Sequence, residues 1–343
     1  MEIRHGFTFD DVLIYPRKSL PSRFSVSTET RITRRHKLRI PIVTANMDTV
    51  TESEMMVTMW KLGGCGILHR NCSIQYEVDQ ILRARQLAPD MTTIAASVGV
   101  KDYVDRAPAI VDAGANVITI DIAHGYSDSM LETLEYLKRN FPHVDVIAGN
   151  VANKEGARVL IDAGADAIKV GIGGGSMCTT RLVTGFGVPQ LTAVMECAEI
   201  AFEADIPIIS DGGIRYAGDM VKAFVAGAES IMIGFLAAST KETPGKCVSL
   251  PGGKTCKIYR GMASTAAREE MMKNVPDEMA AEGVETILEY KGSIIPIIHQ
   301  LVGGICSGMS YGNASTIKEL RECEFVHVTP NVAKENRPHG LQQ

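Results

Sequence analysis

The chain has 343 residues, of which 45% are hydrophobic and 22% charged, a balance typical of a soluble globular protein with room for one large domain or two ordinary ones. Its formal net charge of −5 argues against a broad nucleic-acid-binding surface. No apolar run reaches the ~18 residues of a membrane span, and residues 1–5 lack the apolar segment of a signal peptide. We therefore expect a cytoplasmic protein without a membrane segment.

The eight cysteines are scattered and show no CxxC or Cys/His metal spacing. They are Cys65, Cys72, Cys178, Cys197, Cys247, Cys256, Cys306 and Cys323. In a cytosolic chain such cysteines are reduced thiols, so we expect neither disulfides nor structural zinc.

Eight short apolar runs predict strands that are buried on both faces, because most of them end in Gly, Asp, Asn or His without polar alternation. They span residues 41–45, 64–69, 93–98, 117–121, 144–148, 167–170, 207–211 and 230–234. Helical patterns lie between them at 102–113, 127–140, 154–163 and 216–226.

Three helix-to-strand junctions nearly repeat, and each places a glycine (Gly114, Gly164 or Gly227) at a helix C-terminus. Eight predicted strands with helical patterns between them predict a (β/α)8 barrel. The alternative, a Rossmann sheet, would need a GxGxxG motif early in the chain. Here the glycine-rich loop follows the sixth strand, which favours the barrel.

Three segments fall outside this alternation. Residues 251–254 form a turn that predicts a short hairpin between Val248 and Tyr259. Residues 265–290 are charged and rich in methionine, which suits either an exposed helix with a mobile flap or a solvated surface helix. The tail at 332–343 is expected to be poorly ordered. No low-complexity linker interrupts the chain, so residues 1–343 are expected to form one domain.

The glycine-rich loop at 171–175 follows the sixth predicted strand, and Cys178 comes three residues after its last glycine. Such a loop can cradle a phosphate with its N–H groups or a cation with its carbonyls. Cys178 would be a nucleophile if a helix N-terminus or a positive charge lowered its pKa. A buried, unreactive thiol is the alternative.

In a barrel of this kind the active site lies at the carboxyl ends of the strands, where the sequence places a ring of polar residues. They are Asn46, Asp48, His69, Arg70, Asp121, His124, Asn150, Cys178, Asp211 and Gly234. Any one of them could simply cap a helix, but a full ring is harder to explain as caps. The loops after strands seven and eight, where phosphate is typically held, begin at Asp211 and Gly234.

Seven short stretches, spread over nearly the whole chain, also resemble a known family. They are residues 7–14, 45–50, 147–151, 171–180, 210–214, 259–264 and 307–311. Together they resemble the IMP dehydrogenase/GMP reductase family. One departure is Gly174, which stands where the family usually has proline and should loosen the loop.

The resemblance implies a (β/α)8 barrel, usually tetrameric, that acts on a purine nucleoside monophosphate. Cys178 would attack C2 of the purine to give a covalent adduct, and a nicotinamide cofactor would exchange a hydride with it. The residue type suits this chemistry, because a thiolate adds to an electron-poor ring carbon and later leaves.

The resemblance also implies binding roles for individual residues. Asp211 would accept hydrogen bonds from the ribose, while the backbone at Ser176, Gly213, Gly234 and Phe235 and the Tyr259 hydroxyl would hold the phosphate. The remaining substrate-binding residues would be Asn46, Met47, Gly212, Gly261, Met262, Ala263 and Gly283. The cofactor-binding residues would be Asp121, Ala123, His124, Gly125, Asn150 and Gly171. The carbonyls of Gly173, Gly175 and Cys178 match a site for a monovalent cation such as K+.

Several features favour the reductase branch of this family. The CBS modules that dehydrogenases typically insert between the second and third strands are absent, although some dehydrogenases also lack them. Residues 262–290 contain no Arg-Tyr pair of the kind that activates water in dehydrogenases. Thr180 and Glu282 match the pair that handles ammonia release in reductases, and a threonine beside a carboxylate can relay a proton. Residues 121–127 also resemble the reductase cofactor segment.

Other features resemble the dehydrogenases, namely residues 259–262 and 338–340. Phe235 occupies a position that is normally Gly or Ser, and Met279 replaces an arginine that reductases place near the base. The resemblance therefore implies an NADPH-dependent GMP reductase first and an NAD-dependent IMP dehydrogenase, forming XMP, second. A Schiff-base lyase that uses Lys169 and a nucleotide sensor without catalysis are the remaining alternatives.

Overall fold

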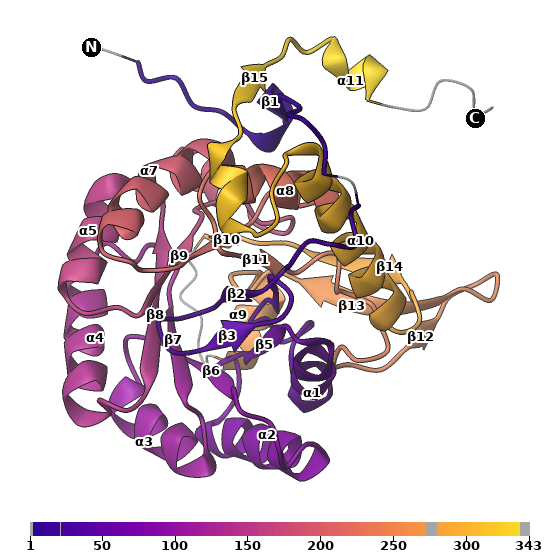
Figure 1. The fold of residues 1–343 in the computed structure, drawn as a ribbon. Coiled ribbons are helices and arrows are strands. Elements are labelled where there is room, and N and C mark those ends of the chain that lie inside the picture. Colours follow the sequence, from indigo (N-terminus) through magenta and orange to yellow (C-terminus); the bar gives the residue numbers. More distant parts are fainter. Residues whose placement is uncertain (1–2, 21, 272–279, 337–343) are drawn as a thin grey trace.

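Eight parallel strands close into a barrel in the computed structural model, which describes residues 3–20, 22–271 and 280–336 (Figure 1). Around the barrel the strands are β4 (Ile42–Thr44), β5 (Cys65–Leu68), β6 (Ala95–Val98), β7 (Val117–Asp121), β8 (Asp145–Val151), β9 (Ala167–Val170), β10 (Ile208–Asp211) and β11 (Ser230–Ile233). β11 pairs with β4 to close the circle. The predicted (β/α)8 barrel is confirmed, and every strand lies where an apolar run predicts it.

Helices surround the barrel as an outer layer (Figure 1). They are α1 (Ser53–Leu62), α2 (Ile74–Leu87), α3 (Tyr103–Ala113), α4 (Asp128–Asn140), α5 (Lys154–Asp162), α7 (Gln190–Glu203), α8 (Ala217–Val225) and α10 (Ile295–Tyr311). Gly114, Gly164 and Gly227 follow α3, α5 and α8 with φ of 116°, 94° and 111°, a left-handed conformation that favours glycine. In the described part of the chain, none of the helices combines the length and the apolar character needed to cross a bilayer.

The inside of the barrel is filled by a cluster of buried side chains to which each strand contributes at least one residue. They are Val43, Cys65, Ala95, Val117, Ile147, Ala167, Ile209 and Met232. Ile32 and Leu38 pack beneath them from a hairpin made by β2 (Thr30–Arg31) and β3 (Lys37–Leu38). This hairpin covers the amino-terminal end of the barrel, and the site of such barrels lies at the other end, where the strands finish.

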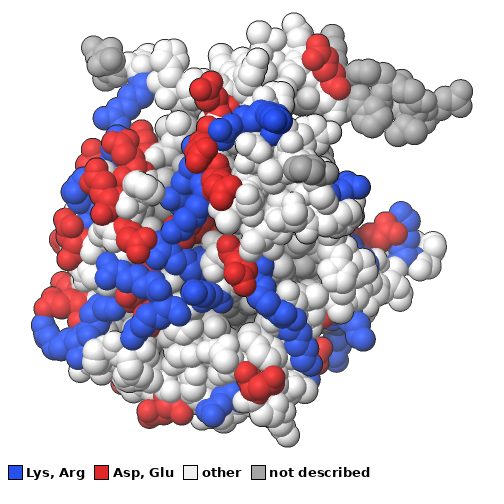
Figure 2. All heavy atoms as spheres, in the orientation of Figure 1, with Lys and Arg blue, Asp and Glu red and all other residues white. Residues whose placement is uncertain are grey.

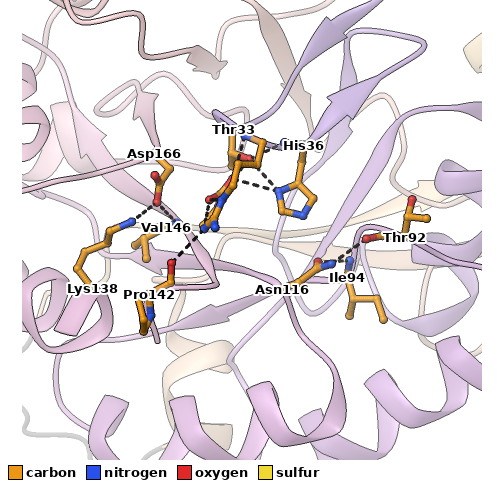
Figure 3. Close-up of polar contacts among 11 residues, drawn as sticks. Thr33, His36, Thr92, Ile94, Asn116, Lys138, Pro142, Val146 and Asp166 are labelled. Atoms are coloured by element: carbon orange, nitrogen blue, oxygen red, sulfur yellow. Dashed lines mark hydrogen bonds and ion pairs between the residues drawn. The ribbon is translucent and has the colours of Figure 1, made fainter. Parts of the chain in front are cut away.

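A buried carboxylate fastens this hairpin to the barrel (Figure 3). Asp145, at the start of β8, accepts hydrogen bonds from the Thr33 hydroxyl at 2.6 Å and from Arg35 Nε at 2.5 Å, and His36 Nδ1 lies 3.1 Å away. Burial alone would raise the pKa of Asp145, but the hydrogen bonds from His36, Thr33 and Arg35 hold it well below its ordinary value. The ionised form of Asp145 is therefore part of the folded barrel.

Lysine and arginine side chains gather over the hairpin at this closed end (Figure 2). Some of them neutralise the carbonyl-rich ends of helices, which carry partial negative charge. Arg39 donates to the carbonyl of Lys61 at 2.8 Å, and Arg85 donates to that of Ala113 at 3.0 Å. These cations have a structural role.

Further elements cover the open end. The predicted hairpin forms from β12 (Val248–Ser249) and β13 (Thr255–Arg260), and β14 (Glu285–Glu289) adds a third strand that was not predicted. α9 (Thr265–Met271) follows β13, so the predicted flap segment begins as a helix and ends as a strand; residues 272–279, with Met279, lie outside the described residues.

Both ends of the described chain also pair with each other. β1 (Val12–Ile14), which follows the short helix η1 (Phe9–Asp11), runs antiparallel to β15 (Phe325–His327), which follows η2 (Lys318–Glu322). The tail from residue 332, which is predicted to be poorly ordered, begins with the short helix α11 (Val332–Glu335). Its Ala, Lys and Glu are strong helix formers. Residues 337–343 lie outside the described residues.

We predict that Asp145→Asn lowers the free energy of unfolding by roughly 3 kcal/mol at pH 7, because it leaves buried donors without an ionised acceptor. Since the folded-state pKa is depressed, the contribution of Asp145 is present above its ordinary pKa of about 4 and is lost on acidification. Urea unfolding from pH 7 to pH 3 should show the stability difference only begin to narrow below about pH 4, because Asp145 takes up its proton as the pH falls toward its depressed folded-state pKa. Glu135→Gln, in an exposed pair with Arg139, is the control and should change stability by less than about 0.5 kcal/mol. Equal stability of both variants would contradict this role.

Candidate active site

A cavity with two connected lobes lies at the carboxyl ends of the barrel strands. The Cys178 lobe, about 410 Å³, is the part lined by Cys178, Thr180 and Glu282. The Gly213 lobe, about 310 Å³, is the part lined by Gly212, Gly213 and Phe235. Both lobes share wall residues that include Ser176, Asp211 and Tyr259. A ligand could therefore extend from one lobe into the other.

The glycine-rich loop forms the wall between the lobes, and its conformation requires glycine. Gly171 has φ of 145°, and a β-carbon there would lie 2.0 Å from the carbonyl oxygen of Asp211. Gly173 has φ of 74°, and the Arg181 side chain fills the space where its β-carbon would be. The loop then leads through Cys178 into the short helix α6 (Thr180–Thr184).

Cys178 begins a chain of hydrogen bonds that ends on a carboxylate. Its thiol donates to Thr180 Oγ1 at 3.1 Å, and the Thr180 hydroxyl donates to Glu282 Oε2 at 2.7 Å. Along this chain a proton can move from the thiol to the carboxylate, which would leave a nucleophilic thiolate. The predicted grouping of Cys178, Thr180 and Glu282 is present in the structure.

Backbone pairing brings Glu282 to the cysteine loop from 102 residues further along the chain. The Thr179 N–H donates to the Glu282 carbonyl at 3.0 Å, and the Glu282 N–H donates to the Ala263 carbonyl at 3.1 Å. Gly283 forms bridges to both Cys178 and Ser264. Gly283 is therefore a structural neighbour of the cysteine, and it does not line the cavity as the predicted substrate-binding role would require.

An ammonium group at the mouth of the barrel holds two carboxylates. Lys169 Nζ, from β9, lies 2.9 Å from Asp121 Oδ1 and 3.1 Å from Asp211 Oδ2, and it also donates to Asn150 Oδ1. Asn150 in turn donates to Asp211 Oδ2 at 2.9 Å and to the Gly171 carbonyl at 2.7 Å. This network fixes the positions of three predicted site residues, Asp121, Asn150 and Asp211.

The charges of this network stabilise each other. Burial alone would lower the pKa of Lys169, but Asp121 and Asp211 raise it above its ordinary value. Burial alone would likewise raise the pKa of Asp121, and Lys169 and Arg70 hold it below its ordinary value. A Schiff base needs the free amine, so the ion pairs argue against the lyase alternative and favour the structural role for Lys169.

The Gly213 lobe offers neutral hydrogen-bond donors. The hydroxyls of Ser176 and Tyr259 lie 3.1 Å apart, and burial raises the pKa of Tyr259 to about 12, so this hydroxyl keeps its proton. Within the described ranges, the N–H groups of Gly234 and Phe235 donate to no protein group. The Gly213 N–H differs from the prediction, because it already donates to the Gly174 carbonyl at 2.9 Å.

Most predicted site residues line one of the two lobes. The Cys178 lobe contains Asn46, Met47, Asp121, Ala123, Asn150, Gly171, Gly173, Gly175, Ser176, Cys178, Thr180, Asp211, Tyr259, Gly261, Met262, Ala263 and Glu282. The Gly213 lobe adds Gly212, Gly213, Gly234 and Phe235. His124 and Gly125 line neither lobe, so their predicted cofactor-binding role stays a prediction. The chain turns away after Ala123, and the Gly125 N–H donates to the Asn150 carbonyl at 2.6 Å.

Several residues that line the cavity carried no predicted binding or catalytic role. Arg70, which the sequence placed in the polar ring, lines the Cys178 lobe, and Asp10, Arg181 and Arg215 line the Gly213 lobe. The position of Arg70 after the second strand was a usable signal. Asp10 carried none, because it precedes the barrel and reaches the cavity only through the folded N-terminal segment.

The family resemblance implies that a nicotinamide dinucleotide and a monovalent cation bind near Cys178. The residues there suit the dinucleotide better than the cation. Beside Cys178, the cavity wall made by Arg70, Asp121, Ala123 and Gly171 offers cationic, anionic and backbone groups suited to a nicotinamide dinucleotide. For a monovalent cation, the Gly175 carbonyl already accepts the Cys178 N–H at 3.1 Å, although a carbonyl oxygen has a second lone pair. The cation site at Gly173, Gly175 and Cys178 therefore stays a prediction.

Comparisons with known proteins agree with this geometry. The family model of the IMP dehydrogenase/GMP reductase domain matches residues 6–339. An inosine-5'-monophosphate dehydrogenase of Aquifex aeolicus is 36% identical, with 99% of this chain and 96% of that protein covered. A GMP reductase of Leishmania donovani is 34% identical, with 98% and 97% covered. A crystal structure of a Trypanosoma brucei GMP reductase variant in complex with guanosine 5'-monophosphate has a TM-score of 0.92 at 33% identity, with 99% of each chain covered.

The parallel barrel carries a cysteine in a glycine-rich loop at the carboxyl ends of its strands. This arrangement and the family match indicate an oxidoreductase that acts on purine nucleotides. The chain belongs to the IMP dehydrogenase/GMP reductase family. Enzymes of this family use a nicotinamide dinucleotide, and relatives of both kinds are similar to this chain to nearly the same degree.

We predict that Lys169→Met lowers the free energy of unfolding by roughly 3 kcal/mol, because Asp121 and Asp211 would lose their shared counter-charge. Urea unfolding at pH 7 measures this loss of stability. The matched control is Lys154→Met, which removes an exposed pair with Glu199 and should cost less than about 1 kcal/mol. If the two variants were equally stable, the ion pairs of Lys169 would not stabilise the folded protein as proposed.

Proposed function

We propose that this protein is an NADPH-dependent GMP reductase, which converts GMP, NADPH and a proton to IMP, ammonia and NADP+. One observation carries the proposal: the hydrogen-bonded series from Cys178 through Thr180 to Glu282. This series joins a nucleophile to a group that can store its proton. Release of ammonia needs such a proton, because an amine leaves a carbon readily only when it is protonated.

The proposed reaction begins when Glu282 accepts the Cys178 proton through the Thr180 hydroxyl. The thiolate adds to C2 of guanine, and the proton returns by the same route to the exocyclic amine as ammonia leaves. Cys178 then stays bound to C2 until it is displaced and IMP is released. When bound, NADPH supplies the hydride that replaces sulfur at C2.

The other residues of the cavity position the reactants in this proposal. Asp211 accepts hydrogen bonds from the ribose, while Ser176, Tyr259 and the free N–H groups of Gly234 and Phe235 hold the phosphate. Asp121, Ala123, Asn150, Gly171 and Arg70 form the wall against which the cofactor would bind. By likeness to its family, we also propose a homotetramer in the cytoplasm.

The second candidate function is NAD-dependent oxidation of IMP to XMP. It is supported by the dehydrogenases of Aquifex aeolicus and Cryptosporidium parvum, which are 36% and 37% identical to this chain. Residues 259–262 also resemble dehydrogenases. Against it, residues 262–290 hold no Arg-Tyr pair to activate water. Glu282 through Thr180 would then have to serve as the base.

Absorbance at 340 nm with purified protein tests both candidates. With GMP and NADPH, we expect absorbance to fall while ammonia appears in equal amount. With IMP, NAD+ and potassium, we expect no rise. A rise in the second mixture alone would replace the reductase proposal with the dehydrogenase. Binding of GMP or IMP with no change in either mixture would favour the sensor.

Three variants test the roles within the relay. Cys178→Ala should abolish turnover and leave GMP binding within about threefold. Glu282→Gln and Thr180→Val should lower kcat by about 10²-fold or more, with little change in KM, because each interrupts proton transfer. Thr184→Val, one helical turn beyond Thr180, is the matched control and should keep normal kcat. Full activity of Cys178→Ala would exclude the covalent mechanism.

A further inference from the structure

The donors that face the Gly213 lobe around the proposed phosphate position are neutral. They are the hydroxyls of Ser176 and Tyr259 and the N–H groups of Gly234 and Phe235. A nucleoside monophosphate carries nearly two negative charges at pH 7, since the second pKa of a phosphate ester is about 6. Phe235 contributes no side-chain donor. The lobe would therefore hold a dianion more tightly if a cation took part.

Two cations line the Gly213 lobe, and they differ in how firmly they are held. Arg181 Nη2 donates to the carbonyls of Val188 at 2.6 Å and Ile172 at 3.2 Å, so this guanidinium is part of the loop structure. Arg215 has half of its side chain exposed (52%) and hydrogen-bonds to Asp10, whose side chain is 65% exposed. Among the described residues that line the lobe, Arg215 is the cation that can turn without breaking a backbone contact.

Arg215 stands at the edge of the proposed phosphate position. It follows Gly213 and Ile214 directly, on the loop after β10, and it lines the same lobe as Gly234 and Phe235. Its other charged and aromatic neighbours are Lys222, Asp219 and Tyr216. Asp219 lies 3.9 Å from Arg215 Nε, and the Tyr216 ring lies 5.8 Å from its guanidinium carbon. Neither contact is close enough to fix its direction.

Asp10 comes from the N-terminal segment, which also lines the lobe. The short helix η1 is capped by Thr8 and Asp11, whose side chains bond to each other at 2.7 Å. The Asp10 carboxylate takes no part in that cap and bonds only to Arg215 among the described residues. It therefore acts as a replaceable counter-ion.

We propose that Arg215 is a substrate-binding residue that exchanges Asp10 for the phosphate of the nucleotide, so that it selects nucleoside monophosphates over nucleosides. Arg215 would form charge-assisted hydrogen bonds to the phosphate oxygens, for which its planar guanidinium is suited. Asp10 would hold Arg215 in the absence of substrate and would compete with the phosphate when substrate arrives. This inference rests on the proposed function.

Calorimetric titration of the full-length protein with GMP and with guanosine tests the exchange. Arg215→Gln should weaken GMP binding by roughly tenfold and leave guanosine binding unchanged, because only GMP carries the phosphate. Asp10→Asn should instead tighten GMP binding by about two- to fivefold, since it removes the competing carboxylate. An ion pair with a merely structural role would give losses of the same sign in both variants, and that result would overturn the proposal.

Two further measurements sharpen the test. At pH 5.5, where the phosphate is mostly a monoanion, the effect of Arg215→Gln on GMP affinity should shrink. Arg17→Gln, in an exposed pair with Glu322 at 3.0 Å, is the matched control and should bind GMP normally. If the wild type binds GMP but shows no turnover, the reductase proposal fails and the Arg215 result still stands. If turnover is normal and Arg215→Gln binds GMP as the wild type does, the Arg215 inference alone fails.

Discussion

The positions of the site residues depend on one buried ion network at the mouth of the barrel. Lys169 lies between Asp121 and Asp211, and Asn150 ties the network to the backbone of the glycine loop. The three charged side chains come from β7, β9 and β10, so the network also links strands that are not all adjacent. Because unpaired charges are costly to bury, the two carboxylates can face the cavity only while the ammonium remains between them. The ion network thus holds two carboxylates, which can accept hydrogen bonds, at the open end of the barrel.

The reactive part of the site is built on a different principle. Cys178 lies on the glycine loop, Thr180 begins the short helix α6, and Glu282 precedes β14, all outside the barrel strands. Backbone hydrogen bonds from Thr179 and to Ala263 hold these segments together. The barrel therefore supplies a rigid floor, and the segment that leads into β14 brings Glu282 to the cysteine loop. Such a division lets chemistry change through loop residues while the nucleotide-binding floor stays the same. Relatives with two different reactions on this fold agree with that view.

Local sequence patterns predicted the fold well, because strand burial and helix-ending glycines such as Gly114 act over a few residues. The position of Cys178 in a glycine loop pointed to the site directly. Its partner Glu282 and the other binding roles required the family resemblance. Contacts between distant segments were beyond local patterns: Arg215 and Asp10 are 205 residues apart, and the Gly213 N–H is taken up by a carbonyl across the loop. β14 was missed because it is short and lies at a partly exposed edge. Its exposed side chains, two glutamates and Ile287, alternate with half-buried ones.

The pairing of β1 with β15 has a consequence for how the protein matures. Residues 8–10, just before β1, line the Gly213 lobe, and β1 pairs with β15, a strand that follows all the barrel strands in the chain. A ribosome-bound chain can thus close much of its barrel and still lack a finished nucleotide pocket. Substrate binding would then stabilise only completed chains, by the usual linkage between ligand affinity and folding. Truncated products gain no such protection, so cellular proteases would remove them preferentially.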